Sequence, residues 1–254
     1  MSNRPPLSEV TRSTEFFAAF ADLAIRVTRA NDAAEVTVLV GNAATLVDAD
    51  AAAFASFVRD DETYESYRFV LACDAVWCLE YESGACYMHD PWIEYARHHA
   101  EPVLGEDVAA RTDREAEVVA LARRYGFASA IIIPTQSPQG LTRLGALCIG
   151  SAEPDHFNNE GLTAVACAAT PLAMRLHDWQ IAQLRQELRD QARLSDDDIR
   201  LLQYEWRGLG SKQVAARMNM TSMSVDSRWQ RLNAKLGVSS RSAAARLAAE
   251  YGLI

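Results

Sequence analysis

Residues 211–236 read SKQVAARMNMTSMSVDSRWQRLNAKL, and their pattern predicts two helices joined by a tight turn. Ser211 caps the first helix, which is short. Its inward-facing apolar residues recur at helical spacing: Val214, Ala215 and Met218. Thr221 ends the turn and caps the second helix. The second helix buries residues spaced four, three and four apart: Val225, Trp229, Leu232 and Leu236.

The free face of the second helix is polar. A short helix, a tight turn and a second helix of this kind fit the major groove of a DNA duplex. We therefore expect a helix-turn-helix that binds double-stranded DNA, and the alternative is a helical module that docks a protein. The candidate DNA contacts lie on the turn and on the second helix: Thr221, Ser222, Ser224, Asp226, Ser227, Arg228, Gln230 and Arg231.

Two further helices flank this pair and complete an all-α domain of four helices over residues 194–254. Ser195 caps the first of them, with three acidic residues after it at the positive end of the helix dipole. Its expected apolar face consists of Ile199, Leu202 and Trp206. Gly208-Leu209-Gly210 ends this helix, and the last helix is expected over residues 241–251.

The charge of the chain is divided unevenly. The formal net charge is −9, which by itself argues against a nucleic-acid partner. Residues 194–254 nevertheless carry nine Lys or Arg and six Asp or Glu, so the acidic excess lies in the remainder of the chain. This asymmetry fits a cationic DNA-binding module attached to an acidic domain with another task.

The C-terminal sequence closely resembles the LuxR-type helix-turn-helix. The matching residues are Leu194-Ser195, Gly208, residues 214–218 (VAARM), Val225, residues 235–241 (KLGVSSR) and residues 252–254 (GLI). Asp198 stands where this family usually has Glu, and Asp226 stands at a position that is commonly basic. The resemblance implies a transcriptional regulator. A homodimer is expected, because one recognition helix reads few bases and paired helices read two half-sites.

The sequence before residue 179 predicts an α/β/α sandwich with a mainly antiparallel sheet, so that the whole chain is α+β. Strands are expected at residues 51–58, 66–73, 131–133 and 144–149, and the last two form a hairpin around a turn from Pro134 to Gly140. Helices are expected at residues 15–28, 33–47, 115–125 and 161–188, with helical spacing also within 77–90. Gly126 is expected to end the third of these helices in a left-handed conformation.

The expected domains are residues 8–178, a polar linker at 179–193, and residues 194–254. An imperfect apolar stripe lies near the linker: Leu176, Trp179, Leu184 and Leu188. It is either a helical dimer seam or the docking face of a helix on its own domain.

Trp77, Tyr81, Asp90 and Pro91 follow a W-x3-Y-x8-D-P pattern. This resembles the signature of the autoinducer-binding domain of quorum-sensing LuxR proteins, and the likeness spans most of residues 16–175. The resemblance implies that the Trp77 indole N–H donates to the lactone carbonyl of an acyl-homoserine lactone. It also implies that the Asp90 carboxylate accepts from the amide N–H of the same ligand. From the residues alone, core packing for the aromatic pair and a turn for Asp-Pro are the alternatives.

Four positions depart from the pattern of that family. Cys73 stands in place of a tyrosine that binds the acyl carbonyl, and Cys148 in place of a ligand-binding Ser or Thr. Gly105 replaces a second pocket tryptophan, and Ala130 replaces a glycine. We count Cys73 and Cys148 with Trp77, Tyr81 and Asp90 as candidate ligand contacts. The departures predict a cavity that is roomier or differently polar, for an unusual acyl- or aryl-homoserine lactone or another small amphiphile.

Several other classes of protein are not expected. A phosphoacceptor receiver needs a lysine, yet Lys212 and Lys235 lie in the C-terminal domain and are the only lysines. Metal-ligand spacing, nucleophile motifs and phosphate loops are not found, so no metal, cofactor or enzymatic activity is expected. The N-terminus lacks a signal peptide, apolar runs are too short for a membrane span, and the five cysteines fit reduced thiols in the cytoplasm.

The sequence therefore predicts a cytoplasmic regulator in which a small effector biases a dimer and hence its DNA binding. The rival is a ligand-independent or protein-regulated transcription factor whose N-terminal domain serves only as a dimerisation scaffold.

Overall fold

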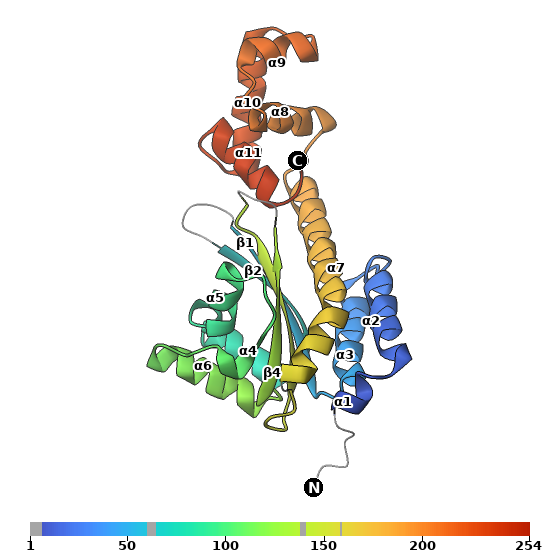
Figure 1. Ribbon diagram of the computed structural model, residues 1–254. Helices are drawn as coiled ribbons and strands as arrows, with labels where there is room; N and C mark the ends of the chain where they lie inside the picture. The colour runs from blue at the N-terminus through green and yellow to red at the C-terminus, as the bar shows by residue number, and fades with distance from the viewer. Residues whose placement is uncertain (1–6, 60–64, 138–140, 158) are drawn as a thin grey trace. The chain divides into compact units, whose positions relative to one another are not determined.

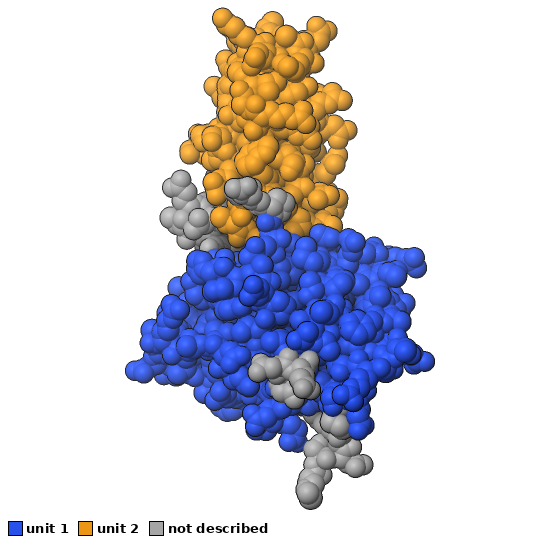
Figure 2. All heavy atoms as spheres, in the orientation of Figure 1, with its two compact units in different colours: residues 1–57, 67–137, 144–179 blue, residues 58–66, 138–143, 180–254 orange. Residues whose placement is uncertain are grey.

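The computed structural model describes residues 7–59, 65–137, 141–157 and 159–254. Contacts between residues divide the chain into two compact units, which Figure 2 shows in different colours. The first comprises residues 1–57, 67–137 and 144–179, and the second comprises residues 58–66, 138–143 and 180–254. The α+β class is confirmed. The domain boundaries stay a prediction, and most of the expected linker is helical.

The first unit is built around a five-stranded sheet with the order β2-β1-β5-β4-β3. Its strands are β1 (Ala51–Arg59), β2 (Glu65–Ala72), β3 (Val103–Leu104), β4 (Ser129–Gln136) and β5 (Leu144–Ser151). The pairs β1–β5, β5–β4 and β4–β3 are antiparallel. Ala53, Cys148 and Ile132 lie opposite one another in this register, so their side chains share one face of the sheet.

Helices cover both faces of the sheet, as Figure 1 shows, and the expected α/β/α sandwich is confirmed. One face carries α1 (Leu7–Val10), α2 (Thr14–Val27), α3 (Ala33–Leu46) and α7 (Asn159–Gln191). The other carries α4 (Ala75–Ser83), α5 (Pro91–His98) and α6 (Asp113–Arg124). Two short 3-10 helices are η1 (Cys86–Met88) and η2 (Gly105–Asp107). Gly126 follows α6 with a φ of 94°, as expected.

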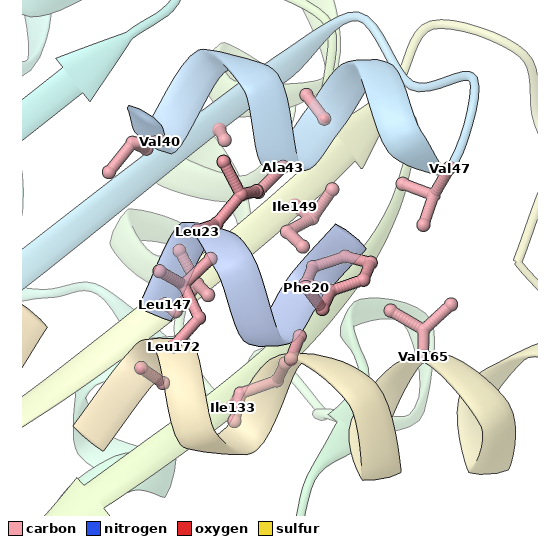
Figure 3. Packing of buried hydrophobic residues seen from close by; sticks show 14 of the residues in the cluster. Phe20, Leu23, Val40, Ala43, Val47, Ile133, Leu147, Ile149, Val165 and Leu172 are labelled. Carbon is pink, nitrogen blue, oxygen red and sulfur yellow. The ribbon is translucent and has the colours of Figure 1, made fainter. Parts of the chain in front are cut away.

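The larger core lies between the sheet and the helices α2, α3 and α7. Figure 3 shows Phe20 and Leu23 of α2 against strand residues such as Leu147 and Ile149. Strand β1 is buried on both faces: Ala52 and Phe54 join this core, and the odd-numbered residues from Ala51 to Phe57 face α4 to α6. A strand covered on both sides reads as a continuous apolar run rather than as an alternation.

Two expectations for the first unit need correction. Strand β4 continues through Pro134 to Gln136, so the turn begins later than expected; residues 138–140 of that turn lie outside the described residues. Strand β3 pairs only with Ile131 and Ile132, so β4 has one neighbour at Pro134, where a missing amide hydrogen is tolerated. Helix α5 was not expected, because the Asp90-Pro91 pair at its start is also typical of a turn.

The apolar stripe near the linker docks on the chain itself. Leu176 and Leu184 have no exposed surface. Trp179 is partly buried, and its indole donates to the carbonyl oxygen of Ala30 at 3.4 Å. The helix that carries them, α7, runs without a break through Pro171 to Gln191.

The C-terminal part of the second unit contains α8 (Asp196–Trp206), α9 (Ser211–Met218), α10 (Ser222–Leu236) and α11 (Arg241–Glu250). Residues from all four helices form its core: Leu201, Leu202, Val214, Val225, Trp229, Leu232 and Ala244. The predicted inward residues Val214, Val225, Trp229 and Leu232 are therefore confirmed.

Two local expectations in this unit are wrong. Trp206 is 52% exposed, because Leu201 and Leu202 fill the core from the middle of α8 and Trp206 lies at its last turn. The cap of α9 is Gly210, whose N–H donates to Oε1 of Gln213 at 3.1 Å. Ser211 is instead the first residue of the helix, which frees its hydroxyl for another contact.

Candidate functional site

A cavity lies in the first unit, on the sheet face covered by α4 and α5. Its volume is about 30 Å³, which is room for about two waters. It is lined by Ala53, Ala55, Phe69, Trp77, Tyr81, Asp90, Trp92, Ile93, Phe127, Ala146 and Cys148. A mostly apolar wall with a few polar groups is typical of a small-molecule site.

Local periodicity explains how several of these side chains meet. Ala53 and Ala55 lie two apart on β1, and Ala146 and Cys148 lie two apart on β5, so each pair points to one face. These small side chains form the floor of the cavity. Trp77 and Tyr81 lie four apart on α4 and therefore share one helix face above that floor.

Asp90 caps the start of α5 and also accepts a hydrogen bond from Tyr81, another residue of the cavity wall. Its Oδ1 accepts the backbone N–H of Trp92 at 2.8 Å and that of Ile93 at 3.4 Å, and its Oδ2 accepts the Tyr81 hydroxyl at 2.7 Å. Burial raises the pKa of Asp90, while these hydrogen bonds act to lower it. Burial and the neighbouring Asp90 raise the pKa of the Tyr81 hydroxyl. Tyr81 therefore acts as a donor to Asp90.

Trp77 brings an unused hydrogen-bond donor to the cavity. Its side chain is 6% exposed, and its ring lies 4.9 Å from the Tyr81 ring and 5.6 Å from the Phe127 ring, between centroids. Its Nε1–H has no acceptor among the residues that the structure describes. A buried donor without a partner costs about 1–3 kcal/mol, so an acceptor supplied by a ligand would recover that energy.

The two candidate cysteines differ in position. Cys148 lines the cavity, and burial raises the pKa of its thiol. Cys73 does not line it and packs beside it against two apolar clusters, where burial raises its pKa to about 12. Both thiols remain protonated at neutral pH and act as small apolar groups with weak donors.

The structure adds wall residues that the sequence analysis did not identify. Trp92 and Ile93 follow Asp90-Pro91 on α5, Phe69 comes from strand β2 just before α4, and Phe127 comes from a distant segment. The glycine at 105 adds no room to the cavity, because the Trp92 indole fills the space above it. A Cβ atom on Gly105 would lie 2.9 Å from Cζ2 of Trp92.

The second candidate site is the polar face of α10. Thr221 caps the helix, since its Oγ1 accepts the Ser224 N–H at 3.1 Å. Ser227, Gln230 and Arg231 are exposed, as their spacing predicts. The first turn also exposes Met223 at 79%, and Lys212 and Arg217 of α9 are exposed basic residues. The sequence analysis did not identify these three, although the spacing from the buried Val214 and Val225 gives their faces.

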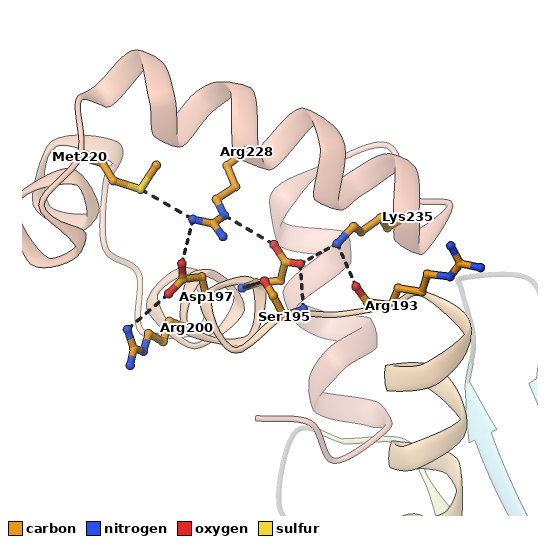
Figure 4. Close-up of polar contacts among 8 residues, drawn as sticks. Arg193, Ser195, Asp197, Arg200, Met220, Arg228 and Lys235 are labelled. Atoms are coloured by element: carbon orange, nitrogen blue, oxygen red, sulfur yellow. Dashed lines mark hydrogen bonds and ion pairs between the residues drawn. The ribbon is translucent and has the colours of Figure 1, made fainter.

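Arg228 points toward α8 rather than lying with the exposed residues of α10. Its Nη1 lies 3.0 Å from a carboxylate oxygen of Asp197, and its Nε lies 3.7 Å from one of Asp198 (Figure 4). Asp198 is buried and also binds Nζ of Lys235 at 2.8 Å and the Ser195 N–H at 3.1 Å. Arg228 therefore contributes to this ion-pair cluster.

Asp226 belongs to a second polar cluster. Its Oδ1 accepts from Nη2 of Arg241 at 2.7 Å and from the Ser211 hydroxyl at 3.1 Å, and Nη1 of Arg241 donates to Ser211 at 2.7 Å. The hydrogen bond from Arg241 lowers the pKa of Asp226. These contacts join the first turns of α9 and α11 to the second turn of α10, and Arg241 also lies 5.5 Å above the Trp229 ring. Asp226 is thus engaged within the protein.

Comparison with protein families identifies both parts of the chain. The family described as autoinducer binding domain matches residues 32–179, more than half of the chain. Bacterial regulatory proteins of the luxR family match residues 192–248. The chain belongs to the LuxR family. It is a ligand-responsive, DNA-binding transcriptional regulator rather than an enzyme, and dimerisation is typical of this family.

Several LuxR-type regulators of known structure have the same fold as this chain. Escherichia coli SdiA has a TM-score of 0.67 at 16% identity, over 94% of this chain and 99% of that one. SdiA in complex with octanoyl-rac-glycerol has a TM-score of 0.66 at 16% identity, over 94% and 96%. CepR2 of Burkholderia cenocepacia, described as an N-acylhomoserine lactone dependent transcription factor, has a TM-score of 0.58 at 14% identity, over 68% and 98%. No curated protein sequence matches the chain.

The structure also bears on membranes and metals. Within the described ranges, no helix is both long and apolar enough to cross a membrane. The same residues contain no group of three or more His, Cys, Asp or Glu side chains that could hold a metal ion.

Replacing Gln230 with alanine is expected to weaken binding to the specific DNA site by about 1–3 kcal/mol, because the contact to one base pair is lost. Gln230 is exposed in the middle of α10, and its single side-chain amide offers both the carbonyl acceptor and the NH2 donor that a bidentate contact to a base needs. The measurement is a titration of duplexes selected from a random library, with a scrambled duplex as the control. An equal loss on both duplexes would assign Gln230 to backbone contact or to folding.

Proposed function

We propose that this regulator senses a small neutral amphiphile, with an acyl- or aryl-homoserine lactone as the leading candidate. Trp77 donates to an acceptor of the effector, and the Asp90 carboxylate accepts from an effector N–H. Tyr81 supports Asp90, and Cys148 forms part of the wall. The observation that carries this proposal is the buried Nε1–H of Trp77: the residue lines the cavity, and this N–H has no acceptor among the described residues.

Three features of the cavity support a neutral ligand with both a donor and an acceptor. Its wall is mostly apolar, so a charged ligand would lose hydration without an opposite charge beside it. The single carboxylate, Asp90, favours a donor such as an amide. Trp77 requires an acceptor such as a carbonyl. The name of CepR2 and the octanoyl-glycerol bound to SdiA show amphiphilic ligands in proteins of this fold.

On the DNA side, we propose that Ser222, Ser224, Ser227, Gln230 and Arg231 contact the duplex, with Thr221 fixing the helix start. A homodimer acting in the cytoplasm would present two such helices to a pseudo-palindromic site. Asp226 and Arg228 then act by positioning the helices, because both are engaged in ion pairs within the domain.

The test of the ligand site uses Trp77→Phe, which removes one donor and keeps most of the aromatic bulk. Molecules that co-purify with the protein from its native host would be identified by mass spectrometry and titrated into both proteins. We expect the affinity to fall about 5- to 30-fold, since a hydrogen bond contributes about 1–2 kcal/mol.

The rival function, a scaffold without a ligand, makes the opposite prediction. A ligand that binds the folded state must raise the melting temperature by mass action. A melting temperature that no lactone and no host extract changes would support the scaffold. An affinity that Trp77→Phe leaves unchanged would place the ligand away from Trp77.

A further inference from the structure

Trp92 is held in place by hydrogen bonds at both ends. Its backbone N–H donates to Oδ1 of Asp90 at 2.8 Å, which fixes the residue in the first turn of α5. Its indole Nε1–H donates to the carbonyl oxygen of Gly105 at 3.2 Å, across the space between α5 and η2. The side chain is 7% exposed. A tryptophan fixed in this way has little freedom to change rotamer.

Gly105 provides the surface on which the indole lies. A Cβ atom there would come within 2.9 Å of Cζ2 and 3.1 Å of Cε2 of Trp92, and within 3.2 Å of Cδ1 of Ile132. Real side chains essentially never approach below 3.0 Å, so any residue other than glycine would displace the ring. The position of the Trp92 indole therefore depends on glycine at 105.

The indole forms one wall of the cavity. The cavity lies where two apolar clusters meet: Trp77, Tyr81 and Ile93 belong to one, and Trp92 and Phe127 belong to the other, together with Ala130 and Ile132. Trp92 thus lies between the polar groups of the cavity and Gly105. The cavity of about 30 Å³ is smaller than any lactone, so side chains of its wall must move when one binds, and the Trp92 ring, hydrogen-bonded at both ends, is held against such movement.

We infer that Trp92 selects the effector by size, an inference that rests on the function proposed above. With its indole on Gly105, the cavity accepts a compact acyl or aryl group and excludes a long chain on that side. Trp92 is therefore a specificity-determining residue of the effector site, and Gly105 is a positioning residue that acts through it.

The geometric part of the inference is tested without any ligand by a double-mutant cycle on the full-length protein. Gly105→Ala is expected to lower the melting temperature of the wild-type protein, because the new methyl group displaces the indole. In a Trp92→Leu background the same change should have a much smaller effect, because the ring is gone. Equal losses in both backgrounds would show that Gly105 does not position Trp92 and would overturn the inference.

The selectivity is tested with N-butanoyl- and N-octanoyl-homoserine lactone as probes. The measured quantity is the ratio of the two affinities in the wild type, in Trp92→Ala and in Trp92→Leu. We expect the wild type to prefer the butanoyl lactone. In both variants the ratio should shift toward the octanoyl lactone by about tenfold or more, because each added methylene then finds apolar space. Trp179→Ala is the matched control, because Trp179 is partly buried outside the cavity.

The outcomes separate this inference from the function it rests on. A ratio that is the same in the wild type and in both Trp92 variants overturns the size selection, while binding that still needs Trp77 keeps the proposed function. A shifted ratio that Trp77→Phe does not affect keeps the size selection and contradicts the proposed hydrogen bond. No binding of either lactone by any folded variant contradicts both.

Discussion

Replacing Asp90 with alanine is expected to lower the affinity for the effector about 5- to 150-fold, which corresponds to about 1–3 kcal/mol. The effector N–H that Asp90 accepts would be left buried without a partner, and the Tyr81 hydroxyl would lose its acceptor at 2.7 Å. The measurement is a calorimetric titration of the host-derived effector into the wild type and the variant.

Asp90 also caps α5, so this change needs a control for the lost cap. Asp74 provides it: its carboxylate caps α4 by accepting the Val76 N–H at 2.8 Å, and Asp74 does not line the cavity. Both changes should lower the melting temperature of the protein without ligand, by a cap worth about 0.5–2 kcal/mol. Only Asp90→Ala should also reduce the affinity. If Asp74→Ala reduces it equally, the loss comes from helix stability and Asp90 is not a ligand contact.

Replacing Lys235 with methionine is expected to destabilise the DNA-binding domain by about 3–5 kcal/mol, reduced to the extent that Arg228 compensates. Asp198 is 5% exposed, and Lys235 is its closest cationic partner, at 2.8 Å, with Arg228 at 3.7 Å. Methionine keeps the apolar stem and leaves the buried carboxylate with its weaker partner. The measurement is chemical unfolding followed by a signal from this domain.

Lys212→Met is the matched control, because Lys212 is the other lysine of the chain and is exposed. It should change the free energy of unfolding by less than about 0.5 kcal/mol. A similar loss in both variants would mean that the effect comes from net charge and that the contact between Lys235 and Asp198 contributes little.

The pH dependence provides a second check on the same contact. Burial acts to raise the pKa of Asp198, but the hydrogen bonds from Lys235 and Ser195 outweigh it and the pKa is lowered. A carboxyl group whose pKa is lowered by folding stabilises the protein above its unfolded value of about 3.9, and this contribution is lost as the pH falls through the folded value. The difference between the wild type and Lys235→Met should therefore be large at pH 7 and shrink below about pH 4.

Most helices, several of their caps and the polar face of α10 follow from neighbouring residues, and the sequence predicts them. The exceptions are α5, which was not expected, and the cap of α9, which is Gly210 rather than Ser211. The capping box formed by Ser195 and Asp198, the cap at Thr221 and the left-handed Gly126 each involve residues within four positions of one another. The exposure of Gln230 follows from the helical period in the same way. Family resemblance supplied what local physics does not, namely that Trp77 and Asp90 face one site.

The cavity wall and the ion pairs could not be predicted in this way. Ala53 and Phe127 reach the cavity from segments far from α4, and no local pattern connects them with Trp77. Asp226 and Arg228 have the helical spacing of exposed DNA contacts, yet Arg241 and Asp197 engage them from other helices. Which side chains pair in this way depends on how the helices pack together, and the residues next to Asp226 or Arg228 in the sequence do not predict that packing.

The sequence by itself determined the secondary structure, the fold class and the family, because hydrophobic periodicity, caps and motif spacing act over a few residues along the chain. The tertiary structure alone decided the size of the cavity. A glycine at 105 predicts open space when only its own missing side chain is considered. The indole of Trp92, thirteen residues earlier in the chain, reaches that space and fills it, because protein interiors are close-packed and leave few voids.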